Sequence, residues 1–266
     1  MCQNSADKIK NLHEYLSGLG SCLVAFSGGQ DSAFLLFHAR EVLGDNVTAF
    51  TFYAPYTPAR DVKDVISFVR RMKIPCKRVK VPLLDSLRYN PANRCYLCKR
   101  YTFGMIKAGA DNLGYSRVLD GTNADDLNEV RPGINALREL GIESPLARFG
   151  ISKREICKWL CERKEALGLK PASGCLMTRM PEGHEVSAKE LKRIDMAEEY
   201  LATQGIHQVR VRSDGKTARI EVPPENRRRF FDEEFLNSVA RELKNMGYRY
   251  VSLDLDGYKK GNMDLS

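Results

Sequence analysis

The sequence lacks any long hydrophobic run. No stretch of about 18 apolar residues occurs that could cross a membrane as a helix. The amino-terminal segment, Met1 to Lys8, also lacks the apolar core of a signal peptide. Internal repeats and low-complexity tracts are absent, and an apolar share of 43% is ordinary for a globular chain. We therefore expect a globular protein of the cytoplasm that has no contact with a membrane.

Several common functional patterns are missing too. The glycine-rich segment after residue 26 lacks the Gly-Lys-Ser/Thr of a Walker loop and the spacing of a dinucleotide fingerprint. Beside one Cys-x-x-Cys pair there is neither a second such pair nor a closely spaced histidine pair, so a four-ligand zinc site is not predicted. Eight cysteines in a reducing compartment argue against a disulfide framework and indicate metal binding or thiol chemistry. The net charge of +8 suits a phosphate-bearing ligand, nucleic acid or a solvated basic surface, and does not decide among them.

The sequence does contain apolar runs that alternate with segments whose apolar residues recur with the period of a helix. This pattern predicts an α/β fold, a parallel sheet with flanking helices. After about residue 184 the pattern changes, because Asp214-Gly215 between alternating segments predicts a β-hairpin, followed by a charged helix and a last strand. We expect an α/β domain over residues 1–184 and a small α+β domain over residues 185–266. The strands of the first domain are expected at 22–26, 47–52, 76–81 and 117–119, and the helices of the chain at about 6–18, 31–43, 59–73, 97–113, 152–167, 187–203 and 224–246.

The segment SGGQDS, Ser27 to Ser32, separates the first strand from the following helix. A glycine-rich turn at this place presents unpaired backbone N–H groups and the positive end of the helix dipole, so it attracts phosphate. The string matches SGGxDS, the pyrophosphate loop of the ATP pyrophosphatases. The resemblance implies that Gly28, Gly29 and the hydroxyls of Ser27 and Ser32 bind the β and γ phosphates of ATP, while Asp31 helps to place Mg²⁺. An ordinary strand-to-helix turn is the alternative, but such a turn does not require this string.

Three cysteines form a second candidate site. Cys95 and Cys98, in NRCYLCKR, have the spacing that lets two thiolates face one metal centre or pair as a redox dithiol. Cys175 lies in a glycine-containing loop. Three thiolates can hold a [4Fe-4S] cluster and leave one iron free for an exogenous ligand. The alternative is that these cysteines are small apolar residues of the core, but the charged neighbours of Cys95 and Cys98 argue against it. For Cys157 and Cys161, which lie one helical turn apart among apolar residues, packing in the core is the interpretation we favour.

A longer series of motifs resembles the LarE family of ATP-dependent sulfur transferases over about residues 8–262. It consists of SGGQDS, RCYLCKR, LDGTNADD, SPLARFGISKREI, PASGCLMTRMPEG, QVRVR, ARIEV and LDLDGYKKGNM, in this order. The resemblance implies adenylation of a carboxylate of pyridinium-3,5-biscarboxylic acid mononucleotide and its conversion to a thiocarboxylate, during biosynthesis of the nickel-pincer nucleotide cofactor. It also implies a homo-oligomer.

The family divides by its source of sulfur. In one branch the cysteine at the position of Cys175 attacks the adenylate, gives up its sulfur and remains as dehydroalanine. In the other branch two further cysteines join it to hold a four-iron cluster that carries the transferable sulfide. Because this chain has Cys95 and Cys98 in addition to Cys175, we favour the cluster branch.

Further residues are candidates for binding metal and substrate. Asp125 and Asp126 follow a predicted strand and are candidates for Mg²⁺, although capping of a loop explains them equally well. The period of two in QVRVR places Arg210 and Arg212 on one face of the hairpin, where two guanidinium groups can hold a phosphate. A solvated cross-strand pair is the alternative. The resemblance adds two residues of the loop after Cys175 to this phosphate site, Thr178, where the motif more often has serine, and Arg179.

Two other functions stay open at this point. A tRNA thiolase of the same loop family would agree with the positive charge, but the chain has no additional RNA-binding domain and no clustered basic and aromatic surface. This argues against nucleic acid as a partner. A regulatory or scaffold protein that binds nucleotide without turnover is the third hypothesis.

Overall fold

The computed structural model describes residues 5–128, 132–165 and 174–258, which form two compact units. The first unit comprises Met1–Tyr53, Asp61–Val81 and Asn93–Ala172, and the second comprises Ala54–Arg60, Pro82–Ala92 and Ser173–Ser266. Compact units are not in themselves folding domains, so the domain boundary near residue 184 stays a prediction.

A parallel sheet forms the centre of the first unit, as the alternation of elements predicted. Its strands are β1 (Cys22–Ala25), β2 (Val47–Tyr53), β3 (Cys76–Lys80) and β4 (Val118–Leu119), in the order β3-β2-β1-β4. β1 therefore has a neighbour on each side, and the direction of winding changes between β1 and β4. In open α/β sheets ligands bind outside the carboxyl ends of the strands at such a change of direction.

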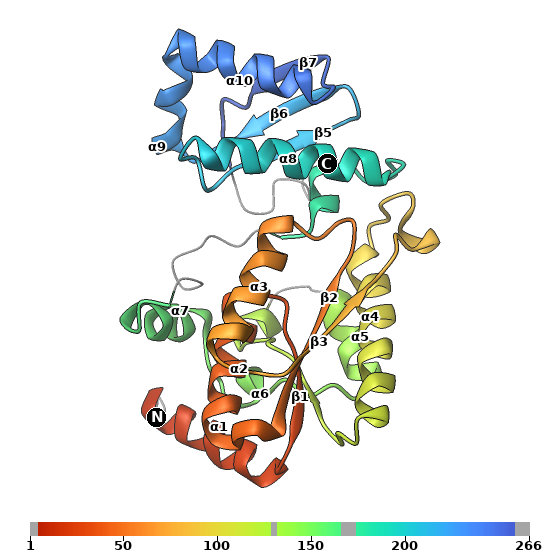
Figure 1. Cartoon of the computed structure of the whole chain (residues 1–266), viewed down its shortest axis with the longest axis vertical. Coiled ribbons are helices and arrows are strands. Elements are labelled where there is room, and N and C mark those ends of the chain that lie inside the picture. Colours follow the sequence, from red (N-terminus) through yellow and green to blue (C-terminus); the bar gives the residue numbers. More distant parts are fainter. Residues whose placement is uncertain (1–4, 129–131, 166–173, 259–266) are drawn as a thin grey trace. The chain divides into compact units, whose positions relative to one another are not determined.

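Helices cover both faces of this sheet, as Figure 1 shows. Alternate residues of β1 point to opposite faces: Cys22 and Val24 pack with α1, α2, α3 and α7, whereas Leu23 packs with α4 and α5. The first unit is thus built of three layers. Its helices are α1 (Ser5–Leu19), α2 (Gln30–Leu43), α3 (Ala59–Arg71), α4 (Arg94–Asn112), α5 (Pro132–Glu139), α6 (Pro145–Arg148) and α7 (Lys153–Glu162), with the short 3₁₀ segments η1 (Gly44–Asn46) and η3 (Asp125–Asn128).

The second unit contains a three-stranded sheet, in which β5 (Arg210–Ser213) and β6 (Thr217–Glu221) form the predicted antiparallel hairpin and β7 (Tyr250–Leu253) pairs in parallel with β6. Asp214 closes the hairpin by accepting hydrogen bonds from the backbone N–H groups of Lys216 and Thr217. The sheet packs against α8 (Ala188–Thr203) and α10 (Glu233–Asn245) through a separate apolar core. The short elements are η2 (Asp85–Leu87), η5 (Leu176–Arg179), α9 (Pro224–Arg227) and η6 (Arg228–Phe231).

The structure corrects several predictions about the elements. The single helix expected over 224–246 is wrong, because the chain leaves the helical conformation at Asp232, whose carboxylate accepts a hydrogen bond from the N–H of Phe235 and so begins α10. α4 begins at Arg94, three residues before the expected start, and α5 and α6 were not predicted. Cys161 is exposed, so core packing is the wrong interpretation for it. The helix expected to end at 167 is too long, because α7 ends at Glu162 and residues 163–165 are not helical; only the last two positions of that prediction lie outside the described residues. Among those residues, none of the helices has both the length and the apolar character that crossing a bilayer requires.

Candidate nucleotide and sulfur-transfer site

The predicted phosphate loop and the LDGTNADD segment lie at adjacent strand ends. β1 and β4 pair in parallel, with Leu23 opposite Val118 and Val24 opposite Leu119. The loop SGGQDS follows β1, and the segment 120–126 follows β4. Because parallel strands end at the same edge of a sheet, the order of the strands brings these two motifs together.

The loop is held in shape by its own hydroxyl groups. The Oγ atoms of Ser27 and Ser32 lie 3.2 Å apart, the N–H of Gly29 donates to Ser27 Oγ, and Ser32 Oγ donates to the carbonyl of Gly29. Gly28 has φ +80°, and a Cβ atom there would lie 2.9 Å from Val65 Cγ2. Only glycine fits this position without strain. The loop therefore presents backbone N–H groups at the first turn of α2, as an anion-binding loop requires.

Gly121, the glycine of LDG, packs directly on the start of α2. A Cβ atom at this position would lie 2.7 Å from the backbone nitrogen of Ser32 and 2.9 Å from its Cα. No side chain can be accommodated without displacing the backbone of the helix. The end of β4 thus fixes the first turn of α2, and with it the orientation of Asp31.

Asp31 forms an ion pair with a lysine that is distant in the sequence. Lys153 Nζ lies 2.6 Å from Asp31 Oδ1, and both side chains are partly exposed. The backbone N–H of Lys153 donates to Asp125 Oδ2 at 2.7 Å. One residue therefore links two of the acidic groups that the sequence proposes as Mg²⁺ ligands. Asp126 is buried and accepts a hydrogen bond from the N–H of Asn123, so it shapes the loop after β4. A role of Asp125 and Asp126 in binding Mg²⁺ stays a prediction.

Lys153 is positioned by the capped start of α7. Ser152 and Glu155 form a capping box, in which each side chain accepts from the backbone N–H of the other residue. Lys8 on α1 and the hydroxyl of Ser5 also bind the carboxylate of Glu155. Although partial burial alone would raise the pKa of Glu155, the hydrogen bonds from Ser5, Ser152 and Lys8 lower it to about 2. Glu155 is thus a fixed anion at the start of the helix that carries Lys153.

Cys95 and Cys98 lie in the first two turns of α4, because this helix begins three residues before the expected start. Residues three apart lie on the same face of a helix, so both thiols point to one side. Cys95 is exposed, Cys98 is partly exposed, and both are in the reduced form. α5 packs closely against this turn, because a Cβ atom on Gly133 would lie 2.8 Å from Lys99 Cδ. The two thiols therefore project from a supported turn.

Cys175 belongs to the second unit, where it precedes η5. Its carbonyl accepts hydrogen bonds from the N–H and the hydroxyl of Thr178 and from Arg179 Nη1. The side chain is a partly exposed, reduced thiol. Residues 171–173 of the PASGCLMTRMPEG motif lie outside the described residues. A three-cysteine cluster would combine thiols of both units and stays a prediction.

The arginines predicted to hold a phosphate are buried in the second unit. The guanidinium of Arg179 is only 1% exposed and forms two hydrogen bonds with the carboxylate of Glu198, at 2.8 and 3.0 Å. Arg212 donates to the carbonyl of Thr178 and lies 2.9 Å from the carboxylate of Glu221, which is fully buried. Both arginines thus hold the fold together, whatever else they bind.

Arg210 has a different environment. It projects from the same face of β5 as Arg212, as the period of two predicted, and its guanidinium lies over the ring of Tyr258. Burial, and next the positive charge of Arg179, lower the pKa of Arg210 to about 10. An anion beside this group would relieve both effects. Phosphate binding by Arg210, Arg212, Thr178 and Arg179 stays a prediction.

Sequence reasoning missed Lys153, Gly121 and Glu198. A signal for Lys153 did exist, because a lysine in the first turn of a helix opposes the helix dipole and so indicates another role. Gly121 and Glu198 gave none, since their roles depend on contacts with residues far away along the chain.

Comparison with known proteins gives three relatives over nearly the whole chain. An uncharacterized protein of Synechocystis sp. is 38% identical over 97% of each chain. An uncharacterized protein of Methanocaldococcus jannaschii is 30% identical over 89% of this chain and 90% of its own length. The pyridinium-3,5-bisthiocarboxylic acid mononucleotide synthase of Lactiplantibacillus plantarum is 32% identical over 97% of this chain and 94% of its own length. No family model matches the sequence.

Proposed function

The chain belongs to the family of the pyridinium-3,5-bisthiocarboxylic acid mononucleotide synthase, and from this premise we propose that it is an ATP-dependent sulfur transferase. Its substrate is pyridinium-3,5-biscarboxylic acid mononucleotide. The enzyme adenylates one carboxylate of this substrate and converts that carboxylate to a thiocarboxylate. The observation that carries the proposal is the SGGQDS loop at the start of α2, with the pair Asp31 and Lys153 beside it. The predicted cytoplasmic location and homo-oligomeric state stay predictions.

The reaction has two steps, which balance as follows. A carboxylate oxygen of the substrate attacks the α phosphorus of ATP, and pyrophosphate leaves. Sulfide then attacks the acyl carbon of the adenylate, and AMP leaves with the oxygen that was activated. Transfer of AMP gives the carboxylate a good leaving group, without which sulfur would not displace an oxygen.

The residues of the first unit fit the adenylation step. The N–H groups of the loop and the hydroxyls of Ser27 and Ser32 would bind the departing pyrophosphate. The carboxylates of Asp31 and Asp125 are hard oxygen donors of the kind Mg²⁺ prefers, and Lys153 contacts both, Asp31 through its amine and Asp125 through its backbone N–H. Mg²⁺, when bound, would neutralise negative charge on the phosphates. Lys153 would then be released from Asp31 and bind a phosphate oxygen.

The second unit would bind the phosphate of the substrate. The lowered pKa of Arg210 supports this assignment, because a cation disfavoured by its surroundings gains most from a bound anion. Arg212 and Thr178, already connected through a hydrogen bond, would complete the site. Arg179 would act through its positive charge, since its guanidinium binds Glu198.

We propose that the sulfur comes from a [4Fe-4S] cluster. Cys95, Cys98 and Cys175 are reduced thiols with exposed or partly exposed side chains, so the donor set fits such a cluster. The cluster, when bound, would supply the sulfide. The alternative is that Cys175 itself gives up its sulfur and becomes dehydroalanine.

Release of pyrophosphate from ATP tests the proposed function. We expect the purified chain to release it only when pyridinium-3,5-biscarboxylic acid mononucleotide is present. Release that depends on tRNA instead would indicate a tRNA thiolase. Binding of ATP without release under either condition would indicate a regulatory protein, and both outcomes would contradict the proposal.

The sulfur source requires its own experiment, on protein prepared without oxygen. The cluster hypothesis predicts about four irons per chain and loss of most of the iron in Cys95→Ala. Cys161→Ala, which removes an exposed thiol on α7, is the matched control and should keep its iron. Mass spectrometry of the spent protein should find Cys175 intact. Loss of the mass of hydrogen sulfide at position 175 in iron-loaded protein would contradict the cluster hypothesis and establish the sacrificial one.

A further inference from the structure

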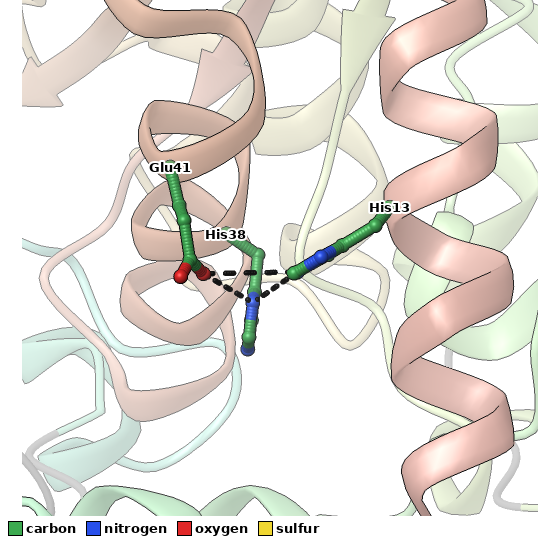
Figure 2. A group of neighbouring side chains, drawn as sticks. All are labelled: His13, His38 and Glu41. Carbon is green, nitrogen blue, oxygen red and sulfur yellow. Dashed lines mark hydrogen bonds and ion pairs between the residues drawn. The ribbon is translucent and has the colours of Figure 1, made fainter.

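Three side chains of the first unit converge between α1 and α2, apart from the residues that the proposed function uses. Figure 2 shows His13, from α1, facing His38 and Glu41, from α2. His13 Nε2 lies 2.7 Å from His38 Nδ1, and the nearer carboxylate oxygen of Glu41 lies 3.5 Å from His38 Nδ1 and 3.8 Å from His13 Nε2. We propose that these three residues form a binding site for a divalent transition metal of the zinc class.

The distances fit such an ion. The circle through three atoms with these separations has a radius of about 2.0 Å, which is close to the zinc–nitrogen and zinc–oxygen bond lengths of about 2.0–2.2 Å. A zinc ion near the centre of the triangle would thus contact all three atoms. Tetrahedral ligation needs ligand atoms roughly 3.3 Å apart. Only the pair of nitrogens must separate further, and the His13 side chain, one-third exposed, has room to turn.

The chemistry of the donors points in the same direction. Two imidazoles and one carboxylate are a ligand set of zinc sites that keep a fourth position for water. His38 and Glu41 are three residues apart on α2, so they lie on one helix face. The side chain of Glu41 is 56% exposed, which leaves a path for the ion to enter.

His38 has the protonation state that a ligand needs. Burial, the nearby His13 and the charge of Arg163 lower the pKa of His38 to about 3, so its imidazole is neutral. A metal on Nδ1 would place the proton on Nε2, which is buried and has no hydrogen-bond partner in the described structure. The rings of Phe34 and Trp159 surround this imidazole at centroid distances of 4.4 and 4.8 Å, where an N–H group can face a π system. The site would hold α1 against α2, the helix that begins at the phosphate loop.

The test is a zinc titration of the metal-free full-length chain against a chromogenic chelator. Cys95, Cys98 and Cys175 are changed to serine in all samples, so that thiolates do not bind the ion. We expect one zinc per chain and a raised Tm, and excess Mg²⁺ should not displace the zinc, because Mg²⁺ prefers oxygen ligands. His13→Ala should weaken zinc binding by more than about 100-fold, because loss of a mere outer-shell partner already weakens binding by ~10–100-fold.

Two matched variants control for general effects of substitution. His207→Ala removes an exposed histidine of the second unit, and Glu14→Gln neutralises an exposed glutamate on α1 beside Lys10. Both should bind zinc like the parent, whereas Glu41→Gln should bind more weakly. Cobalt in place of zinc should give the spectrum of nitrogen and oxygen ligands. Equal zinc affinity of His13→Ala and the parent, or no binding by the parent, would overturn the proposal and leave a hydrogen-bonded pair of histidines.

Discussion

The two units of the chain hold their charged candidate site residues in opposite environments. In the first unit the side chains of Asp31 and Lys153 are 25% and 40% exposed and pair with each other at the end of the sheet. In the second unit Arg179 and Glu198 are almost fully buried, and Arg212 pairs with the fully buried Glu221. An ion pair near the surface contributes little to stability and is easily exchanged for a ligand, whereas a buried pair is strongly destabilising to break.

This difference separates ligand binding from folding. Substitutions of Asp31 and Lys153 should affect catalysis and leave the fold intact. Substitutions of Arg179 and Arg212 in the second unit should affect the fold first, so that loss of activity alone would not identify a binding residue. Arg210 is the exception, because its surroundings disfavour its charge.

Asp31→Ala should have the largest effect of the substitutions that test this comparison. Pyrophosphate release should fall by about 10³-fold, the upper end of the loss seen when a group that stabilises developing charge is removed. The Tm should change little, because a partly exposed carboxylate contributes little to stability. Asp45→Ala, beyond the other end of the same helix, is the control. Release at the parental rate by Asp31→Ala would disprove the assignment.

Arg179→Met and Arg210→Met should differ in stability. The first leaves Glu198 buried without its bidentate partner and should lower the free energy of unfolding by about 3–5 kcal/mol. The second removes a cation that burial already disfavours, so we expect a change within about 1 kcal/mol but weaker binding of the substrate. Urea denaturation and substrate titration measure the two quantities. Equal destabilisation by both substitutions would remove the distinction between these arginines.

Lys153→Met tests whether the lysine acts on ATP. We expect kcat for pyrophosphate release to fall by roughly 10²-fold, because a preorganised positive charge near the phosphates is lost. Lys158→Met, at a position of the same helix that is 75% exposed, should be neutral. If the amine only neutralised Asp31, kcat would stay at the parental value and the apparent affinity for Mg²⁺ would rise, contrary to our proposal.

Glu155→Gln should have the smallest effect, and one that depends on pH. The folded chain lowers the pKa of Glu155 to about 2, from about 4.5 when unfolded, so its ionised form stabilises the fold above pH 4.5. At neutral pH the substitution should cost about 1–2 kcal/mol. The difference from the parent should disappear as the pH falls from about 4.5 towards 2. Glu162→Gln, a more exposed position, should show no such dependence in urea denaturation.

The sequence predicted the sheet and the phosphate loop because their signals are local. Local groups of apolar residues predicted the four strands of the first unit, and the contiguous residues of SGGQDS predicted the loop at the start of α2. Lys153 is 122 positions away from Asp31, and only the fold brings them together. A single sequence contains no record of that contact.

The sequence also gave no sign of which charged side chains are buried. Arginines are mostly exposed in proteins, so nothing in QVRVR indicated that Arg212 pairs with a fully buried glutamate across the hairpin. The start of α10 was missed although its signal, Asp232 before two glutamates, was present. The charged residues on both sides of Phe230 and Phe231 concealed that helix boundary.

The close packing of Gly121 has a consequence for engineering the chain. Its backbone lies outside the left-handed region, so the usual reason for requiring glycine does not apply, and only the lack of space against Ser32 does. At Gly114 the backbone is in the left-handed region, with φ +77°, but no atom lies within 4 Å of the position that a Cβ would take. Asparagine should therefore be tolerated there. In a library randomised at both positions, active clones should therefore show several residues at 114 and glycine alone at 121.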